Sequence, residues 1–203
     1  MPIWTFVRHG QSLANLEGWL AGHLDAPLTE RGRAEAEAAR EHLAPPLPTR
    51  AFCSDLSRAH DTARLMLAGH DIPLTVTPEL RERSCGALER RLVAEVAADP
   101  AYRDRLGSWS ARPPRGESLL DVALRAVAWL ASVDAPEDTL VVGHGALILA
   151  VLTSLDRRPR SDLGTWRPRN CEAIRREVEP GTWMQVLDEL RREALTVTQG
   201  VDG

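Results

Sequence analysis

The sequence predicts an α/β fold: a three-layer sandwich in which helices flank a mostly parallel central sheet. Three observations predict it. Short apolar runs of strand length alternate with longer stretches of helical periodicity along most of the chain. A chain of 203 residues with 43% hydrophobic content can bury one large core, which indicates a single domain over residues 1–203. Polar residues directly follow several of the apolar runs, where ligands bind in sheets of this kind.

The first part of the chain alternates strand, helix, strand and helix. Residues 2–7 form the first expected strand, and residues 10–28 form a loop. A helix is expected over 29–43, because a threonine at its start can cap it and two prolines after it stop it. A short buried strand follows at 50–53, and small or apolar residues at helical spacing predict a second helix over 55–67.

The alternation continues in the middle of the chain. Residues 74–77 read as a strand, and helices are predicted over 89–98 and 117–132. The fully apolar run at 139–142 predicts a buried strand, which leads into an apolar helix over 146–155.

Three remaining segments are less regular. Residues 172–178 and 182–188 flank a Pro-Gly pair, which predicts two strands joined by a turn. The segment 100–116 is rich in Arg, Pro and Trp and is predicted to be an irregular surface excursion, or cover, near the site; whether it covers the site is left open. Residues 193–203 are expected to form a mobile tail.

The composition narrows the class of protein. The net charge is −4 without a basic or acidic tail, so no nucleic-acid partner is expected. Three widely spaced cysteines without a CxxC pair argue against disulfides and structural zinc, and they fit a reducing cytoplasm. No apolar run could cross a bilayer, and the first strand takes the place of a signal peptide, so we expect a cytoplasmic protein without a membrane partner. The sequence does not decide whether the protein forms a homodimer.

The residues that could carry chemistry follow the predicted strands or lie in nearby loops. They are Arg8 and His9 after the first strand, Arg58 after the second, Glu82 after the third and His144 after the fourth. Two guanidinium groups can hold a phosphate dianion. A neutral imidazole can attack phosphorus, and a carboxylic acid can protonate the leaving oxygen. The set therefore fits phosphoryl transfer without a metal.

These motifs resemble those of the histidine phosphatase (phosphoglycerate mutase-like) superfamily. Phe6-Val7-Arg8-His9-Gly10-Gln11, with Asn15 further on, is similar to the opening signature of that family. The likeness runs from about residue 3 to residue 150, and more weakly to about 190. The later matching blocks keep the family's order: Pro27 to Gly32, Ser54 to Ala63, Leu80-x-Glu82, Gly116-Glu117-Ser118 and Gly143-His144-Gly145.

The resemblance implies a phosphoglycerate mutase-like fold and a metal-independent phosphatase that needs no cofactor. His9 would be the phosphorylated nucleophile, and Glu82 would be the proton donor and then the base for water. A small phosphorylated metabolite would be the substrate. The implied catalytic set is Arg8, His9, Arg58, Glu82 and His144, and the implied substrate- and phosphate-binding set is Arg8, Gln11, Asn15, Gly22, Arg58, Arg83 and His144.

Other activities stay open. Family mutases carry a longer excursion with lysine before the second histidine, whereas here 61 residues separate Glu82 from His144 and the chain has no lysine. This favours a phosphatase over a phosphoglycerate mutase-type transferase. A silent phospho-ligand binder has no need of an acid at Glu82. A zinc hydrolase built on His9 and His144 lacks the usual ligand spacing.

The residues that would contact the substrate at the rim of the site are predicted less clearly than the catalytic residues. Cys85 stands where the family often has an aromatic residue, and the segment after Gly86 also departs from common family phosphatases. His23 could face the substrate. The candidates for a rim that binds a second anionic group or a sugar face are Arg83, Trp109, Arg112 and Arg115.

Overall fold

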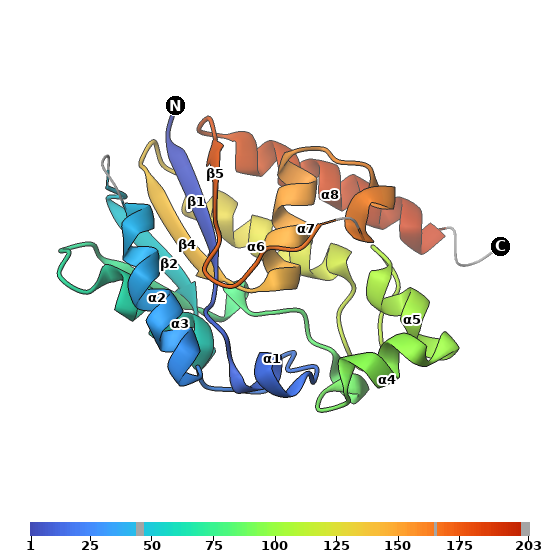
Figure 1. Ribbon diagram of the computed structural model, residues 1–203. Helices are drawn as coiled ribbons and strands as arrows, with labels where there is room; N and C mark the ends of the chain where they lie inside the picture. Colours follow the sequence, from blue (N-terminus) through green and yellow to red (C-terminus); the bar gives the residue numbers. More distant parts are fainter. Residues whose placement is uncertain (44–46, 165, 200–203) are drawn as a thin grey trace.

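A five-stranded sheet in the order β3-β2-β4-β1-β5 forms the centre of the molecule (Figure 1). The computed structural model describes residues 1–43, 47–164 and 166–199. The strands β1 (Ile3–Arg8), β2 (Arg50–Ser54), β3 (Leu74–Thr77) and β4 (Thr139–Gly143) run parallel, and β5 (Ala173–Glu177) is antiparallel to β1. The predicted mostly parallel sheet is confirmed.

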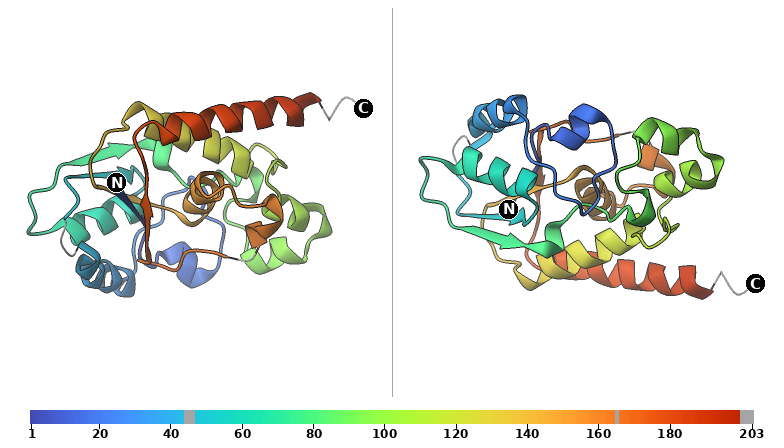
Figure 2. Two further views of the ribbon diagram at one scale, coloured as in Figure 1. Left: turned by 90° about the horizontal axis from the view of Figure 1, so that it is seen from above. Right: turned by 90° about the horizontal axis from the view of Figure 1, so that it is seen from below.

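Helices cover both faces of this sheet (Figure 2). The helices α2 (Glu30–Ala38) and α3 (Ser57–Leu67) lie on one face. The helices α6 (Leu119–Ser132), α7 (Gly145–Leu155) and α8 (Thr182–Gln199) lie on the other. Side chains of a strand alternate between the two faces, so Phe6 packs with α6 and α8 while Val7 packs with α2 and α3. The three-layer prediction is therefore confirmed.

Short helices complete the chain and connect the larger elements. Thr29 caps α2 as expected, because its hydroxyl accepts a hydrogen bond from the Gly32 N–H at 3.0 Å. Ser118 and Asp121 form a capping box that fixes the start of α6. The remaining helical segments are α1 (Leu13–Glu17), α4 (Val93–Ala98), α5 (Pro100–Gly107), and the 3-10 turns η1 (Ala39–Leu43), η2 (Pro78–Leu80), η3 (Gly86–Leu88) and η4 (Arg160–Gly164).

The predicted strand over 182–188 is wrong, because these residues begin α8. Trp183, Val186, Leu187 and Leu190 are all buried, and their spacing of three and four residues places them on one helical face. That face packs on α6, and the Trp183 ring lies edge-on to Trp4 with centroids 5.2 Å apart. The Pro-Gly turn thus joins β5 to a helix, and β1 is the partner of β5.

Two further predictions need correction. The helix expected over 89–98 begins only at Val93, because the Glu89 carboxylate accepts hydrogen bonds from the loops before it. The segment 100–116 is not wholly irregular: Asp99 caps α5 and a proline occupies its first turn. The expected mobile tail is helical through Gln199, and its last residues, 200–203, lie outside the described residues.

Two further expectations from the sequence concern the state of the cysteines and the presence of membrane-spanning helices. Cys53, Cys85 and Cys171 are free thiols and buried. Among the described residues, no helix is both long and apolar enough to cross a membrane.

Candidate active site

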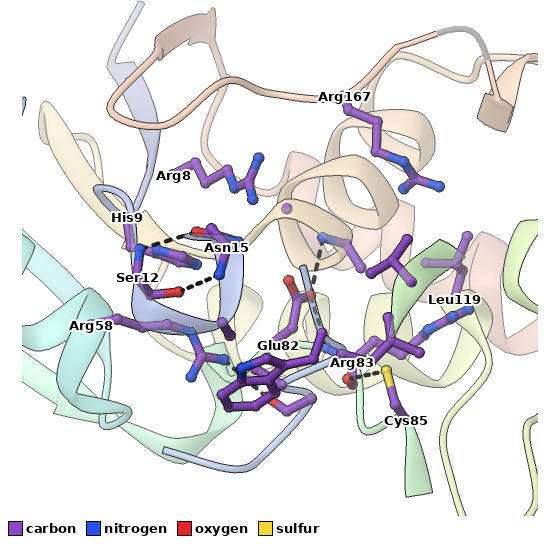
Figure 3. A pocket seen from close by; sticks show the side chains of 18 residues that line it. Arg8, His9, Ser12, Asn15, Arg58, Glu82, Arg83, Cys85, Leu119 and Arg167 are labelled. Carbon is purple, nitrogen blue, oxygen red and sulfur yellow. Dashed lines mark hydrogen bonds between the residues drawn. The ribbon is translucent and has the colours of Figure 1, made fainter. Parts of the chain in front are cut away.

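A cavity of about 380 Å³ opens at the carboxyl ends of the parallel strands (Figure 3). We call the side with Arg8, His9 and Arg58 the near end, and the side with Arg83 and Arg167 the far end; Glu82 lies between them (Figure 3). Seven of the predicted site residues line it: Arg8, His9, Asn15, Gly22, Arg58, Glu82 and Arg83.

His9 follows β1 and is held by its backbone and its ring. Its N–H donates to the Gly143 carbonyl at 3.0 Å, which continues the pairing of β1 with β4. Ring Nδ1 lies 2.7 Å from the Gly10 carbonyl oxygen and donates to it in the neutral ring. The other nitrogen, Nε2, then keeps its lone pair. Burial, followed by the charges of Arg58 and Arg8, lowers the pKa of His9 well below its usual value, so the ring is neutral at pH 7.

Glycine is needed directly after His9. A Cβ atom at Gly10 would collide with the backbone of Gly32, near the start of α2. The Gly10 N–H donates to the Thr62 hydroxyl on α3 at 3.1 Å. This close approach fixes the turn that presents the His9 ring to the cavity.

Two arginines carry positive charge beside His9. Arg58, on the first turn of α3, is 1% exposed and donates to the carbonyls of Leu24 and Gly22, both at 2.9 Å. Arg8, the last residue of β1, donates to the Pro168 carbonyl at 2.9 Å, and its buried Nε has no hydrogen-bond partner among the described residues. Burial lowers the pKa of both guanidinium groups, but arginine still remains charged.

His144 follows β4 and is fully buried behind His9. The two rings meet edge to face, with centroids 5.1 Å apart. Within the described part of the chain, neither ring nitrogen of His144 has a hydrogen-bond partner. Burial and then the Arg58 charge lower the pKa of His144 well below its usual value. A buried, unpaired polar ring is costly, so this ring can accept a ligand as its partner.

The Glu82 carboxylate has one occupied and one open oxygen. Oε1 accepts from the N–H groups of Ala146 at 3.0 Å and Arg83 at 2.9 Å. Oε2 lies 3.8 Å from where a Cβ on Gly145 would be, so it points towards the start of α7 and the cavity. Arg125 and His23 hold this loop from behind, because both donate to the Glu82 carbonyl oxygen.

Asn15 is oriented by its own helix. Its Oδ1 accepts from the Ser12 N–H at 3.2 Å and lies 3.4 Å from Asn170 Nδ2. The amide nitrogen is therefore the group that Asn15 can offer to a ligand. Asn170 also donates to the His9 carbonyl at 2.7 Å, and so it links the segment before β5 to the loop after β1.

Several predicted residues, including His144, are not among the residues that line the cavity. Gln11 accepts a hydrogen bond from the Thr29 hydroxyl at 2.9 Å and is not among the lining residues. Trp109 is buried under the Arg160 guanidinium, and Arg112 is paired with Asp121. Arg115 is also absent from the lining, so Arg83 is the one rim candidate that lies there.

Sequence reasoning missed much of the cavity. Arg167, Asn170 and Arg125 come from segments without a recognisable motif, and only the fold brings them to the strand ends. The cavity also has an apolar wall, which no periodicity in the sequence marks; its members include Trp19, Leu20, Val93 and Leu119.

No group of three or more His, Cys, Asp or Glu side chains suited to a metal ion occurs among the described residues.

The sequence of residues 4–189 matches the family profile of the histidine phosphatase superfamily (branch 1). The chain belongs to this superfamily, and the predicted membership and enzyme class are confirmed.

Its relatives include both phosphatases and mutases. The chain is 38% identical over 199 residues to 2,3-bisphosphoglycerate-dependent phosphoglycerate mutase 2 of Gloeobacter violaceus, covering 92% of this chain and 91% of that protein. It is 32% identical over 192 residues to the adenosylcobalamin/alpha-ribazole phosphatase of Salmonella typhimurium, covering 92% and 90%.

A solved structure of a mycobacterial glucosyl-3-phosphoglycerate phosphatase is also similar. It superposes with a TM-score of 0.78 at 30% identity, covering 86% of this chain and 92% of that one.

Proposed function

We propose that the protein hydrolyses small phosphomonoesters without a metal, through a phosphohistidine on His9. The observation that carries the proposal is the state of the His9 ring. Its Nδ1 is engaged by the Gly10 carbonyl, and its pKa is lowered by burial and by Arg58 and Arg8, so a neutral Nε2 is left beside two cations.

In the first step, Nε2 of His9 attacks phosphorus and the bond from phosphorus to the ester oxygen breaks. Arg8, Arg58 and the Asn15 amide offer donors to the equatorial oxygens. The His144 ring, which is unpaired in the described part of the chain and meets His9 edge to face but is not among the lining residues, is a further candidate partner. Glu82 gives its proton from Oε2 to the leaving oxygen, because Oε1 is occupied by two N–H donors.

In the second step, water attacks the phosphorus and the bond from phosphorus to nitrogen breaks. Glu82, now a carboxylate, takes the proton of the water. Inorganic phosphate leaves, and both His9 and Glu82 return to their starting states. No external reactant other than water is needed.

Hydrolysis is favoured over mutase chemistry by the access to the cavity. A mutase must keep water away from the phosphohistidine. Here none of the described residues of 100–116, the segment expected to form a cover, lines the cavity. The similarity to the Gloeobacter mutase keeps phosphoglycerate mutase activity as the second candidate.

The proposal also includes the cellular compartment in which the protein acts. The free, buried thiols Cys53, Cys85 and Cys171 fit a reducing compartment, so we propose action on a small metabolite in the cytoplasm.

The test is release of p-nitrophenol from p-nitrophenyl phosphate in excess EDTA. We expect turnover by the wild type and a loss of at least about 10³-fold in His9→Ala, with little change in the control His70→Ala. An alkali-stable phosphorylated protein should be trapped in the wild type but not in His9→Ala. Loss of activity in EDTA would overturn the metal-free mechanism. Isomerisation of phosphoglycerate without release of phosphate would favour the mutase instead.

A further inference from the structure

Two pairs of arginines face the cavity from opposite ends (Figure 3). Arg8 and Arg58 lie at the near end beside His9, and Arg83 and Arg167 lie at the far end. Glu82 stands between the two pairs, where the ester oxygen would lie in the proposed function. The far pair is therefore on the side of the leaving alcohol.

The charge of the lining exceeds what one phosphate needs. Four arginines and one glutamate line the cavity, and both nearby histidines are neutral at pH 7. A phosphate dianion offsets two of these positive charges, and the near pair suffices to bind it. At the far end, Arg167 is a source of the remaining positive charge.

Arg167 differs from the arginines near the surface that are held by an ion pair. Arg112 pairs with Asp121 at 2.6 Å, and Arg157 pairs with Glu189 at 2.8 Å. Among the described residues, by contrast, no hydrogen bond or ion pair holds the Arg167 guanidinium. Arg167 is an exposed residue that also lines the cavity, so a charged fork faces the space that a substrate would fill.

The surroundings of Arg167 do not neutralise it. Partial desolvation lowers its pKa most, Glu82 acts against this, and the positive charges of Arg83 and Arg8 lower it further. An anion entering between Arg83 and Arg167 would relieve that repulsion. Leu119 and Val93 provide an apolar wall for the uncharged body of such a ligand.

We propose that Arg167 determines specificity by binding a second anionic group on the alcohol part of the substrate. The preferred substrates are then phosphomonoesters whose leaving alcohol carries a carboxylate or a further phosphate, with a short apolar body between the two charged ends. This inference rests on the proposed function, because that function sets which end of the cavity holds the transferred phosphate.

Isosteric esters test the proposal by changing charge while shape stays constant. The substrates are 3- and 4-carboxyphenyl phosphate, the matching carbamoylphenyl phosphates, and 1,4-phenylene bisphosphate. In the wild type we expect kcat/KM for at least one carboxylate isomer to exceed that of its carboxamide by about tenfold. The bisphosphate shows whether a second phosphate is bound better than a carboxylate.

The variants assign the preference to one residue. Arg167→Gln should reduce the carboxylate-to-carboxamide ratio to about one, and Arg167→Lys should retain part of it because the charge remains but the fork is lost. The control is Arg169→Gln, since Arg169 lies two residues away, is 89% exposed and does not line this cavity. It should keep the full ratio. A wild-type ratio near one for both isomers, or a ratio unchanged in Arg167→Gln, would overturn the proposal.

Binding separates this inference from the proposed hydrolysis. The carboxybenzyl- and carbamoylbenzylphosphonates are not cleaved, and their affinity can be measured by calorimetry whether or not the protein turns over esters. A charge preference that disappears in Arg167→Gln without any turnover would support the role of Arg167 while contradicting hydrolysis. Turnover that needs His9 but shows no charge preference would contradict only the role of Arg167.

Discussion

The near and far ends of the cavity are built in different ways. At the near end, each functional side chain sits on or directly after a strand, or on the first turn of the helix that follows, and backbone bonds fix it: His9 to Gly143, and Arg58 to Gly22 and Leu24. The far end is assembled from loops and helix starts, and Arg167 projects there without a hydrogen-bonded partner in the described part of the chain.

This difference separates two tasks. The near end is preorganised, because buried donors cannot reorient without losing their partners, and preorganised charge is what phosphoryl transfer requires. At the far end, the Arg167 guanidinium has no hydrogen bond or ion pair among the described residues, so it can bind an anionic group of a particular substrate. Changes at the near end should therefore affect all esters alike, whereas changes at the far end should affect the ranking of esters.

The largest effect is expected at the near end, from Arg58→Met. This variant removes a charge-assisted donor to phosphate and leaves the carbonyls of Gly22 and Leu24 without this donor, so kcat/KM for every ester should fall by about 10²–10³-fold. Arg58 also helps to lower the pKa of His9, after burial, so that pKa should rise in the variant.

Steady-state kinetics and an NMR titration of His9 check the two effects. The control is Arg64→Met on the exposed side of α3, which should change neither. A selective loss for some esters only would contradict a common phosphate-binding role of Arg58.

The second effect is expected at Glu117, which holds the loop that follows Glu82. Glu117 accepts from the Ser84 N–H at 2.9 Å and from Arg125 at 3.0 Å. Desolvation acts to raise its pKa, but the contacts with His23, Arg125 and Ser84 outweigh it and lower the pKa to about 2, from the ordinary value of 4.5. The folded pKa is the lower one, so this stabilisation is present above about pH 4.5 and is lost as the pH falls towards 2.

Glu117→Gln should therefore lower the free energy of unfolding by roughly 3 kcal/mol at pH 7, with a smaller loss at acid pH. Urea unfolding between pH 7 and pH 3 measures the difference between the variant and the wild type. That difference should shrink as the pH falls below about 5. A difference that stays constant over this range would show that the Glu117 charge does not provide the stabilisation.

The sequence predicted the near end well and the far end poorly, for a physical reason. Arg8, His9 and His144 sit at strand ends, where parallel topology brings them together irrespective of loop detail. Trp19, Val93 and Arg167 reach the cavity only through tertiary packing, which the local pattern does not encode. The strand predicted at 182–188 failed similarly: a seven-residue window around a Pro-Gly pair hid a helical face that becomes clear over the full length of α8.

A smaller effect is expected for Asn170, which supports the near end without lining it. Its side-chain nitrogen donates to the His9 carbonyl at 2.7 Å and lies near Asn15 Oδ1, so it positions both groups. Asn170→Ala should lower kcat about tenfold with little change in KM.

The isosteric Asn170→Asp separates hydrogen bonding from shape. It lacks the donor and places a negative charge beside two oxygens, so kcat should fall at least as far as in Asn170→Ala. Near-normal kcat in Asn170→Asp would mean that side-chain shape, and not the hydrogen bond, is what matters there.

The smallest effect is expected beyond the far end, at Arg112. Its two bonds to Asp121 are both 2.6 Å long, but the Arg112 side chain is 66% exposed, and exposed ion pairs contribute little. Arg112→Gln should change the free energy of unfolding by at most about 0.5 kcal/mol and leave kcat/KM within about twofold for all esters. Comparison with Arg167→Gln on the same ester series shows which arginines contact the substrate at the far end. If Arg112→Gln also changed the ranking of esters, the segment 100–116 would have to reach the substrate. The open access to the cavity, on which the argument for hydrolysis depends, would then be contradicted.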